Sequence, residues 1–385
     1  MTQGNFPVDK MKGIETPYYY YDMDLLKKTL KVVKEETKKR GFTQHYAVKA
    51  NANRRILELI ASDGFGADCV SGNEIKAAVN AGFPASKIVF AGVGKTDKEI
   101  NLALDLNIFC FNAESLPELE VINELANKKG KIAQVALRIN PNVDAHTHEY
   151  ITTGLNENKF GFALSHLESA IEKLNELKSL KLIGIHFHIG SQIEDINIFE
   201  PLCQKVNELQ DFFESKGIKL ENINLGGGLG IDYENPDKNP ISDFEGYFEV
   251  FKNNLKVRDG QQVHFELGRA IVCQCGALVT RTVYVKHGES KTFVIVDAGM
   301  TDLIRPALYQ AYHKVENISS NLPSQQYDVV GPICESSDVF VKDYDLNETQ
   351  RGDILVLRSA GAYGEIMASQ YNCRDLPKAY YSDKI

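Results

Sequence analysis

The chain has 385 residues, of which 43% are hydrophobic and 25% charged, the proportions of an ordinary globular protein. Its formal net charge of −9 argues against a general binder of nucleic acid or of anionic membranes, but permits a local basic pocket. Seven scattered cysteines without a CxxC pair argue against a disulfide framework or a zinc ribbon. No apolar run approaches the ~20 residues of a membrane span, and the first twelve residues lack a signal-peptide core, so we expect a cytoplasmic protein.

Short apolar or β-branched runs alternate with helix-like stretches through about the first 270 residues, the pattern of βα units. Eight βα units in about 240 residues predict a (β/α)8 barrel. A doubly wound open sheet is the alternative, because periodicity alone does not prove closure. The expected strands cover 45–51, 66–71, 87–92, 108–112, 134–140, 181–190, 222–229 and 262–267. Helices are expected over 54–62, 73–81, 115–127, 164–177 and 199–215.

The pattern changes after about residue 270, where consecutive strands follow one another with little helix. We therefore predict a second, all-β domain of the sandwich or barrel type. The aromatic run 18–21 precedes the first helix and is expected to join this domain. The predicted division is a barrel over 26–268 and a β domain made of 1–25 and 269–385. Its strands are expected over 273–286, 291–297, 326–331, 339–342 and 353–357.

Function in such a barrel lies at the C-terminal ends of the strands, and unusual polar residues fall there. Lys49 ends the first expected strand. It is either a lysine whose ammonium reaches water or a nucleophile with a depressed pKa that can form a Schiff base. His186 and His188 would share one face of the sixth strand. No third ligand nearby completes a metal site, so they are either hydrogen-bonded core histidines or include one imidazole that stacks on an aromatic cofactor.

Two further features end the last two expected strands. Gly226, Gly227 and Gly228 form either a plain tight turn or a loop whose N–H groups bind an anion such as phosphate. Glu266 needs a partner, which is either Arg269 or the pyridine nitrogen of a cofactor. A lysine, a stacking histidine, a glycine-rich loop and a strand-end carboxylate together are what pyridoxal phosphate requires.

Several motifs in the same order resemble a known family, the pyridoxal-phosphate-dependent decarboxylases with an alanine-racemase-like barrel. The resemblance runs from about residue 18 to 377. One departure is Leu267, where the family usually has proline, which leaves the neighbouring charged positions intact. The motifs are YAVKAN (46–51), ADCVSGNE (67–74), NPNVDAHTHEYITTGLNENKFG (140–161), GIHFHIGSQ (184–192), LGGGLGIDY (225–233), ELGR (266–269), GPICESSDVF (331–340) and GAYG with MASQYNCR (361–374).

The resemblance implies a role for individual residues. Lys49 corresponds to the lysine that binds the cofactor covalently, His188 to the histidine stacked on its ring, and Glu266 to the carboxylate that faces its ring nitrogen. Cys334 corresponds to a proton donor supplied by the other protomer, which implies a homodimer with shared active sites; the remaining six cysteines are expected to be packing residues. No metal is implied. Further cofactor contacts are Ser191, Gly226, Gly227, Gly228, Gly268, Arg269 and Tyr363, and the substrate contacts are Arg269, Arg305, Tyr309, Glu335 and Tyr363.

The activity implied by the resemblance is decarboxylation of meso-2,6-diaminopimelate to L-lysine and carbon dioxide, the last step of lysine biosynthesis. Arg305 suits the distal carboxylate and Glu335 the distal ammonium, unless these two side chains pair with each other. The alternatives are a decarboxylase for ornithine, arginine or carboxynorspermidine, a racemase, and a non-catalytic homologue that binds a partner. The CES sequence at 334–336, Arg305 and the stretch HTHEYITTG favour diaminopimelate.

Overall fold

The computed structural model describes residues 6–142 and 159–385, and these form two compact units. The barrel unit comprises Leu30–Gly230 and Asp243–Gly268. The β-rich unit comprises Met1–Thr29, Ile231–Ser242 and Arg269–Ile385. The stretch HTHEYITTG, which bears on the substrate, lies outside the described residues.

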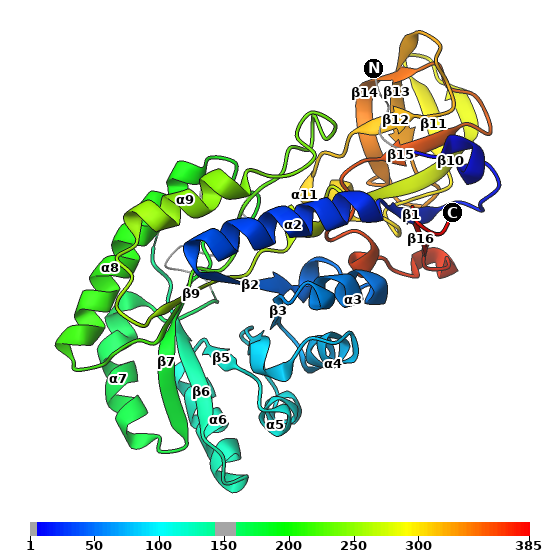
Figure 1. Cartoon of the computed structure of the whole chain (residues 1–385). Coiled ribbons are helices and arrows are strands. Elements are labelled where there is room, and N and C mark those ends of the chain that lie inside the picture. The colour runs from blue at the N-terminus through cyan, green and yellow to red at the C-terminus, as the bar shows by residue number, and fades with distance from the viewer. Residues whose placement is uncertain (1–5, 143–158) are drawn as a thin grey trace. The chain divides into compact units, whose positions relative to one another are not determined.

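Eight parallel strands of the barrel unit close into a barrel, which confirms the (β/α)8 prediction over an open sheet (Figure 1). Each expected strand overlaps one observed strand. The strands are β2 (Phe42–Ala47), β3 (Gly66–Cys69), β4 (Ile88–Phe90), β5 (Cys110–Ala113), β6 (Ala133–Arg138), β7 (Leu180–His186), β8 (Asn222–Asn224) and β9 (Gln262–Phe265).

Five helices of the barrel unit begin at a capping side chain, whereas α7 and α8 have no such cap. Thr96 and Glu99 form a capping box at the start of α5, and the Ser71 and Ser115 side chains accept from the first turns of α4 and α6. In α8 the apolar residues Leu202, Val206, Leu209 and Phe213 recur at helical spacing, and all four are buried. The helices are α2 (Met23–Arg40), α3 (Arg54–Ser62), α4 (Gly72–Asn80), α5 (Asp97–Leu106), α6 (Leu116–Lys128), α7 (Leu167–Glu176), α8 (Phe199–Ser215) and α9 (Phe244–Asn254).

All the barrel strands except β5 end earlier than the sequence indicated, and two of these ends bear on the site. β2 ends at Ala47, so Lys49 lies in a 3₁₀ turn, η1 (Val48–Ala50), and not in the strand. β7 ends at His186, so the prediction that His186 and His188 share a face of one strand was wrong. A strand ends where its backbone hydrogen bonds to the neighbouring strands end, even where the following residues are still apolar. Lys49 and His188 therefore lie two residues beyond the last paired residues of these strands, Ala47 and His186.

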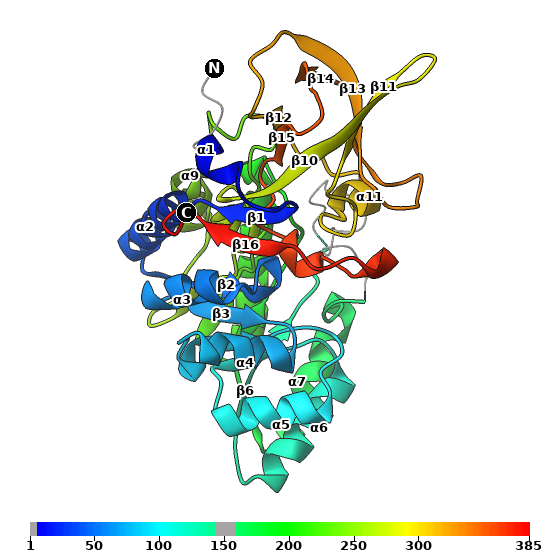
Figure 2. The ribbon, with the colours of Figure 1, turned by 90° about the vertical axis from the view of Figure 1, so that its right-hand side faces the viewer.

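The β-rich unit contains a sheet with strand order β12-β15-β10-β11-β13-β14, and β1 pairs with β10 and β16. The antiparallel pairing of β1 with β10 confirms that the aromatic run 18–21 joins this unit (Figure 2). The strands are β1 (Tyr18–Tyr21), β10 (Gly276–His287), β11 (Thr292–Val296), β12 (Val315–Asn317), β13 (Ser324–Val330), β14 (Val339–Asn347), β15 (Ile354–Leu357) and β16 (Lys378–Tyr381). Its short helices are α1 (Val8–Met11), α10 (Arg269–Val272) and α11 (Arg305–Tyr309).

The two units differ from the expected domain ranges at residues 26–29 and 231–242, both of which belong to the β-rich unit. Side-chain contacts hold the segment 231–242 there. Asp237 pairs with Arg358 at 2.6 Å, and the Tyr233 hydroxyl accepts a hydrogen bond from Arg269 at 2.6 Å. Such pairings are between residues far apart in sequence, so periodicity could not reveal them. In the described part of the chain, no helix is long and apolar enough to cross a membrane.

Candidate active site

Lys49 lies beside a buried carboxyl group in the barrel unit. Its Nζ is 3.6 Å from Oδ2 of Asp68, the third residue of β3, and the lysine side chain is 39% exposed. Asp68 is buried, and its Oδ1 has no hydrogen-bond partner among the described residues. Burial raises the pKa of Asp68 to about 7, with Glu266 acting in the same direction and Lys49 opposing it. Asp68 lies in the motif ADCVSGNE, but no role was predicted for it from the sequence. An acidic residue within an apolar strand was the signal that could have identified it.

The substitution Asp68→Asn tests whether folding raises the pKa of Asp68. A carboxyl group whose pKa rises on folding contributes stability below its unfolded pKa of about 4, and that stability is lost as the pH rises through about 7. The asparagine variant of the cofactor-free protein should therefore gain Tm relative to wild type at pH 8, by about 2–4 °C. At pH 4 the difference should vanish. Calorimetry at both pH values measures this, with Asp345→Asn on the exposed side of β14 as the control. Parallel pH curves for wild type and Asp68→Asn would contradict the assignment.

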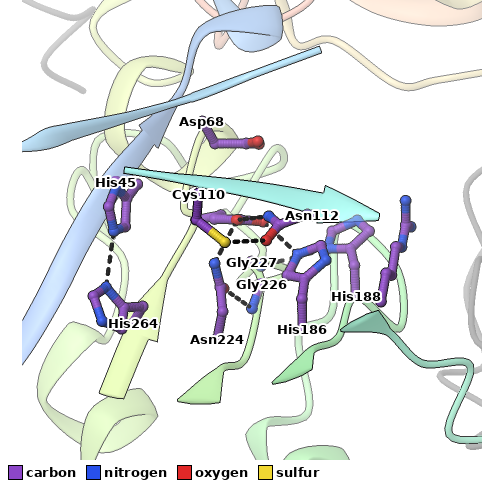
Figure 3. Close-up of polar contacts among 12 residues, drawn as sticks. His45, Asp68, Cys110, Asn112, His186, His188, Asn224, Gly226, Gly227 and His264 are labelled. Atoms are coloured by element: carbon purple, nitrogen blue, oxygen red, sulfur yellow. Dashed lines mark hydrogen bonds and ion pairs between the residues drawn. The ribbon is translucent and has the colours of Figure 1, made fainter. Parts of the chain in front are cut away.

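Glu266 follows β9 and accepts hydrogen bonds from three side chains, those of His186, Asn112 and Asn224, which are labelled in Figure 3. His186 Nε2 donates to Oε2 at 2.8 Å, whereas Asn112 and Asn224 donate to Oε1 at 3.1 and 2.6 Å. Burial alone would raise the pKa of Glu266, but His186 and Lys49 lower it below its ordinary value, so the carboxylate is charged at neutral pH. His186 is thus a hydrogen-bonded core histidine. Asn112 and Asn224 were missed by sequence reasoning, since neither lies in a quoted motif.

His188 is half-buried and lies just after β7. Its Nδ1 accepts the N–H of Gly227 at 3.4 Å. Burial, together with the charges of Lys49 and Arg138, holds the pKa of His188 well below its ordinary value. The imidazole is therefore neutral, as is suitable for a ring that stacks on an aromatic group.

The glycines that follow β8 are required by close approach of the backbone. A Cβ on Gly226 would meet the carbonyl oxygen of Phe187, and one on Gly227 would meet that of Glu266. The N–H groups of Gly226 and Gly227 already donate to Asn224 and His188, whereas no described acceptor takes that of Gly228. An anion at this loop would therefore use the Gly228 N–H first.

The η1 turn, which carries Lys49, also explains why residue 268 is a glycine. A Cβ on Gly268 would lie 3.0 Å from the Cβ atoms of both Ala47 and Ala50. Ser191 is half-buried and follows Gly190, whose carbonyl oxygen would lie 3.2 Å from a Cβ on Gly228. The barrel unit thus brings together the predicted Lys49, the histidine, the glycine loop and Glu266. This donor set fits pyridoxal phosphate: an amine for its aldehyde, an imidazole for its ring face and a charged carboxylate for its ring nitrogen.

The β-rich unit contains two buried arginines, Arg269 and Arg305, which are 5% and 6% exposed. The guanidinium of Arg269 lies 4.9 Å from the ring centre of Tyr363, and that of Arg305 lies 5.9 Å from the ring centre of Tyr309. Arg305 and Tyr309 are the first and last residues of α11, so they lie four positions apart on one face of this helix.

The proposed pairing of Arg305 with Glu335 does not occur. Glu335 accepts a hydrogen bond from the Tyr371 hydroxyl at 2.7 Å. Across residues 6–142 and 159–385, no carboxylate lies within ion-pair distance of Arg305. A buried guanidinium without a protein carboxylate is a site for a carboxylate or phosphate of a ligand.

Cys334 is exposed in the β-rich unit, and its backbone N–H donates to Asn372 at 3.3 Å. All seven cysteines are free thiols; five are buried, as expected of packing residues. Cys373 is exposed as well, so the expectation that it packs in the interior was wrong.

A closed parallel barrel that carries Lys49, a neutral His188 and a charged Glu266 at its C-terminal end defines the class of barrel enzymes that use pyridoxal phosphate. Residues 24–273 match the family described as the pyridoxal binding domain of pyridoxal-dependent decarboxylases.

Similarity to known proteins shows to which group of this class the chain belongs. The chain is 61% identical over 384 residues to the diaminopimelate decarboxylase of Bacteroides thetaiotaomicron, with all of both chains covered. A solved structure of diaminopimelate decarboxylase from Helicobacter pylori with L-lysine is 42% identical, with a TM-score of 0.91 over 98% of this chain and 94% of that chain. Another from M. jannaschii, also with L-lysine, is 35% identical, with a TM-score of 0.89 over 98% and 89%. The chain belongs to the diaminopimelate decarboxylase group of the pyridoxal-dependent decarboxylases, and its cofactor is pyridoxal 5′-phosphate.

Proposed function

We propose that this chain removes one carboxyl group of meso-2,6-diaminopimelate as carbon dioxide and releases L-lysine, the last step of lysine biosynthesis. The observation that carries the proposal is Arg305, a buried cation without a carboxylate partner among the described residues. Diaminopimelate has an amino-acid group at each end, so one carboxylate remains to be bound while the other is lost. Ornithine and arginine have no second carboxylate for this arginine.

Pyridoxal phosphate, when bound, accepts the electron pair left behind by carbon dioxide. We propose that Lys49 binds its aldehyde carbon, that Glu266 faces its ring nitrogen and that His188 covers one face of its ring. The charged form of Glu266, held by His186 and Asn112, keeps a proton on that nitrogen. The residues proposed to hold the phosphate are Ser191, Gly226, Gly227, Gly228, Gly268, Arg269 and Tyr363.

The substrate is proposed to be bound by residues of the β-rich unit. Arg305 takes the distal carboxylate with its planar fork of donors, and Glu335 takes the distal ammonium. Arg269, Tyr309 and Tyr363 complete the substrate contacts. We further propose that the enzyme works in the cytoplasm, where its seven free thiols stay reduced.

We propose that Cys334 protonates the carbon from which carbon dioxide has left, and that it does so in the active site of the second copy of a homodimer. Its exposure in the single chain is compatible with this role. Cys334→Ala should lose turnover by about 10²-fold or more while its cofactor absorption stays unchanged. Cys373→Ala, the other exposed cysteine, is the matched control and should keep full turnover.

Mixing two inactive variants tests whether the sites are shared. When Lys49→Ala and Cys334→Ala chains are refolded or expressed together, a mixed dimer carries one site with both residues intact. Turnover should then recover to a fraction of wild type, although each variant alone is inactive. No recovery in a mixture shown by mass spectrometry to contain mixed dimers would contradict shared active sites.

The direct test of the proposed function is product identification. Purified protein with pyridoxal phosphate should convert meso-diaminopimelate to L-lysine, read by mass spectrometry, with carbon dioxide released in equal amount. Ornithine, arginine and carboxynorspermidine serve as competing substrates. Faster carbon dioxide release from any of these would assign the other specificity, and release from none of the four would reject the decarboxylase assignment.

A further inference from the structure

Tyr233 lies between the two buried arginines of the β-rich unit. Its hydroxyl oxygen accepts a hydrogen bond from Nη1 of Arg269 at 2.6 Å and another from Nη2 of Arg305 at 3.2 Å. Two like charges brought close together in a buried site repel each other. A shared acceptor between them offsets part of that repulsion and ties the position of one guanidinium to that of the other.

The direction of the Tyr233 hydrogen bonds follows from its third partner. Sγ of Cys273 lies 3.4 Å from the Tyr233 oxygen and 3.0 Å from the carbonyl oxygen of Ser359. A carbonyl can only accept, so the Cys273 thiol donates to Ser359 and its sulfur accepts the Tyr233 O–H. The hydroxyl oxygen of Tyr233 therefore keeps its lone pairs for the two arginines, and burial raises the pKa of Tyr233 to about 12, so it remains protonated.

His313 holds Arg305 at a second point. Nε of Arg305 donates to Nε2 of His313 at 3.2 Å, and Nδ1 of His313 donates to the carbonyl oxygen of Arg358 at 3.0 Å. Burial and the charge of Arg305 lower the pKa of His313 to about 3, so the imidazole is neutral and its tautomer is set by these two partners. His313 is 1% exposed.

These contacts leave part of Arg305 for a ligand. A guanidinium has five N–H donors. One on Nε goes to His313 and one on Nη2 goes to Tyr233, so three donors on Nη1 and Nη2 have no hydrogen-bond partner in the described part of the chain. A carboxylate that is bound at two points needs a donor from each of these nitrogens in one plane. The hydrogen bonds at Nε and Nη2 therefore hold the plane of the Arg305 guanidinium in one orientation.

We propose that Tyr233 and His313 are positioning residues that orient the Arg305 guanidinium, and thereby set the selectivity for a carboxylate at the end of the substrate that is not decarboxylated. This inference rests on the proposed function. Neither residue needs to touch the substrate. Loss of either should impair ligands that carry this carboxylate and spare ligands that lack it.

Two ligands separate these effects. L-lysine retains the carboxylate, whereas cadaverine, the corresponding diamine, lacks it. In cofactor-loaded Tyr233→Phe, the Kd of L-lysine measured by calorimetry should rise by about ten-fold, the loss of one hydrogen bond to a charged group. The Kd of cadaverine should stay at its wild-type value. Tyr18→Phe is the matched control, because Tyr18 is fully buried in the same unit and its hydroxyl has no hydrogen-bond partner among the described residues.

A pair of His313 variants tests the second point of attachment. His313→Leu should weaken L-lysine binding, and His313→Gln, whose side-chain oxygen can still accept from Arg305 Nε, should restore part of it. The visible absorption of the bound cofactor and the Tm show that each variant is folded and loaded.

The outcomes are distinct. Unchanged L-lysine affinity in folded Tyr233→Phe and His313→Leu, or equal weakening of both ligands, would overturn the positioning role while leaving the proposed function intact. Wild-type protein that neither binds L-lysine nor releases carbon dioxide from meso-diaminopimelate would overturn the proposed function, and this inference with it.

Discussion

Lys49→Ala should abolish the visible absorption band of the bound cofactor and reduce carbon dioxide release by about 10³-fold or more. The lysine is proposed to be the sole covalent attachment of the cofactor, and a methyl group cannot replace an amine as a nucleophile. Its position supports this role, because the η1 turn places Nζ 3.6 Å from Asp68 and leaves 39% of the side chain accessible. The measurement is an absorption spectrum of protein purified with pyridoxal phosphate, together with turnover.

The control for this variant is Lys76→Ala, an exposed lysine on α4, which should keep both the band and the turnover. Borohydride reduction followed by mass spectrometry locates the attachment in the wild-type chain. A cofactor adduct that persists in Lys49→Ala at another lysine would refute the assignment.

Glu266→Gln should lower turnover by about 10²-fold or more while the cofactor band is retained, since Lys49 still binds the cofactor. The substitution keeps the size of the side chain and removes the charge that stabilises a proton on the ring nitrogen. It also changes the hydrogen bonding, because Glu266 accepts from His186, Asn112 and Asn224. A glutamine can accept at only one of its two terminal atoms, so its NH2 group must face His186, which can accept from it only by changing tautomer. The loss of hydrogen bonds to a charged group should cost about 1–3 kcal/mol in stability.

Kinetics and thermal unfolding separate the two effects of Glu266→Gln. Asn224→Ala removes one donor but keeps the carboxylate, and should lower Tm with a smaller loss of turnover. Glu58→Gln on the exposed face of α3 should change neither quantity. If Glu266→Gln turned over substrate at the wild-type rate, Glu266 would have no role in holding the ring proton.

The barrel could be predicted from the sequence because short apolar runs alternate with helix-like stretches, the pattern of βα units. These patterns are local, so they can be recognised in the sequence without knowledge of the fold. The chemical residues Lys49, His188 and Glu266 were found for the same reason, since a polar residue that follows an apolar run is conspicuous. The addition of segment 231–242 to the β-rich unit could not be predicted, because it depends on Tyr233 and Asp237 meeting distant partners.

The sequence by itself determined the fold class and the pyridoxal phosphate cofactor, and it predicted the residues that should perform the chemistry, because these follow from periodicity and from motifs contiguous in the chain. Only the tertiary structure decided how those residues are held. Asp68 lies beside Lys49, and His186 donates a hydrogen bond to Glu266. Tyr233 and His313 both accept hydrogen bonds from Arg305. Each of these contacts joins residues that are separated in the sequence. Their effects on charge depend on burial and on distances of a few ångströms, which folding alone establishes.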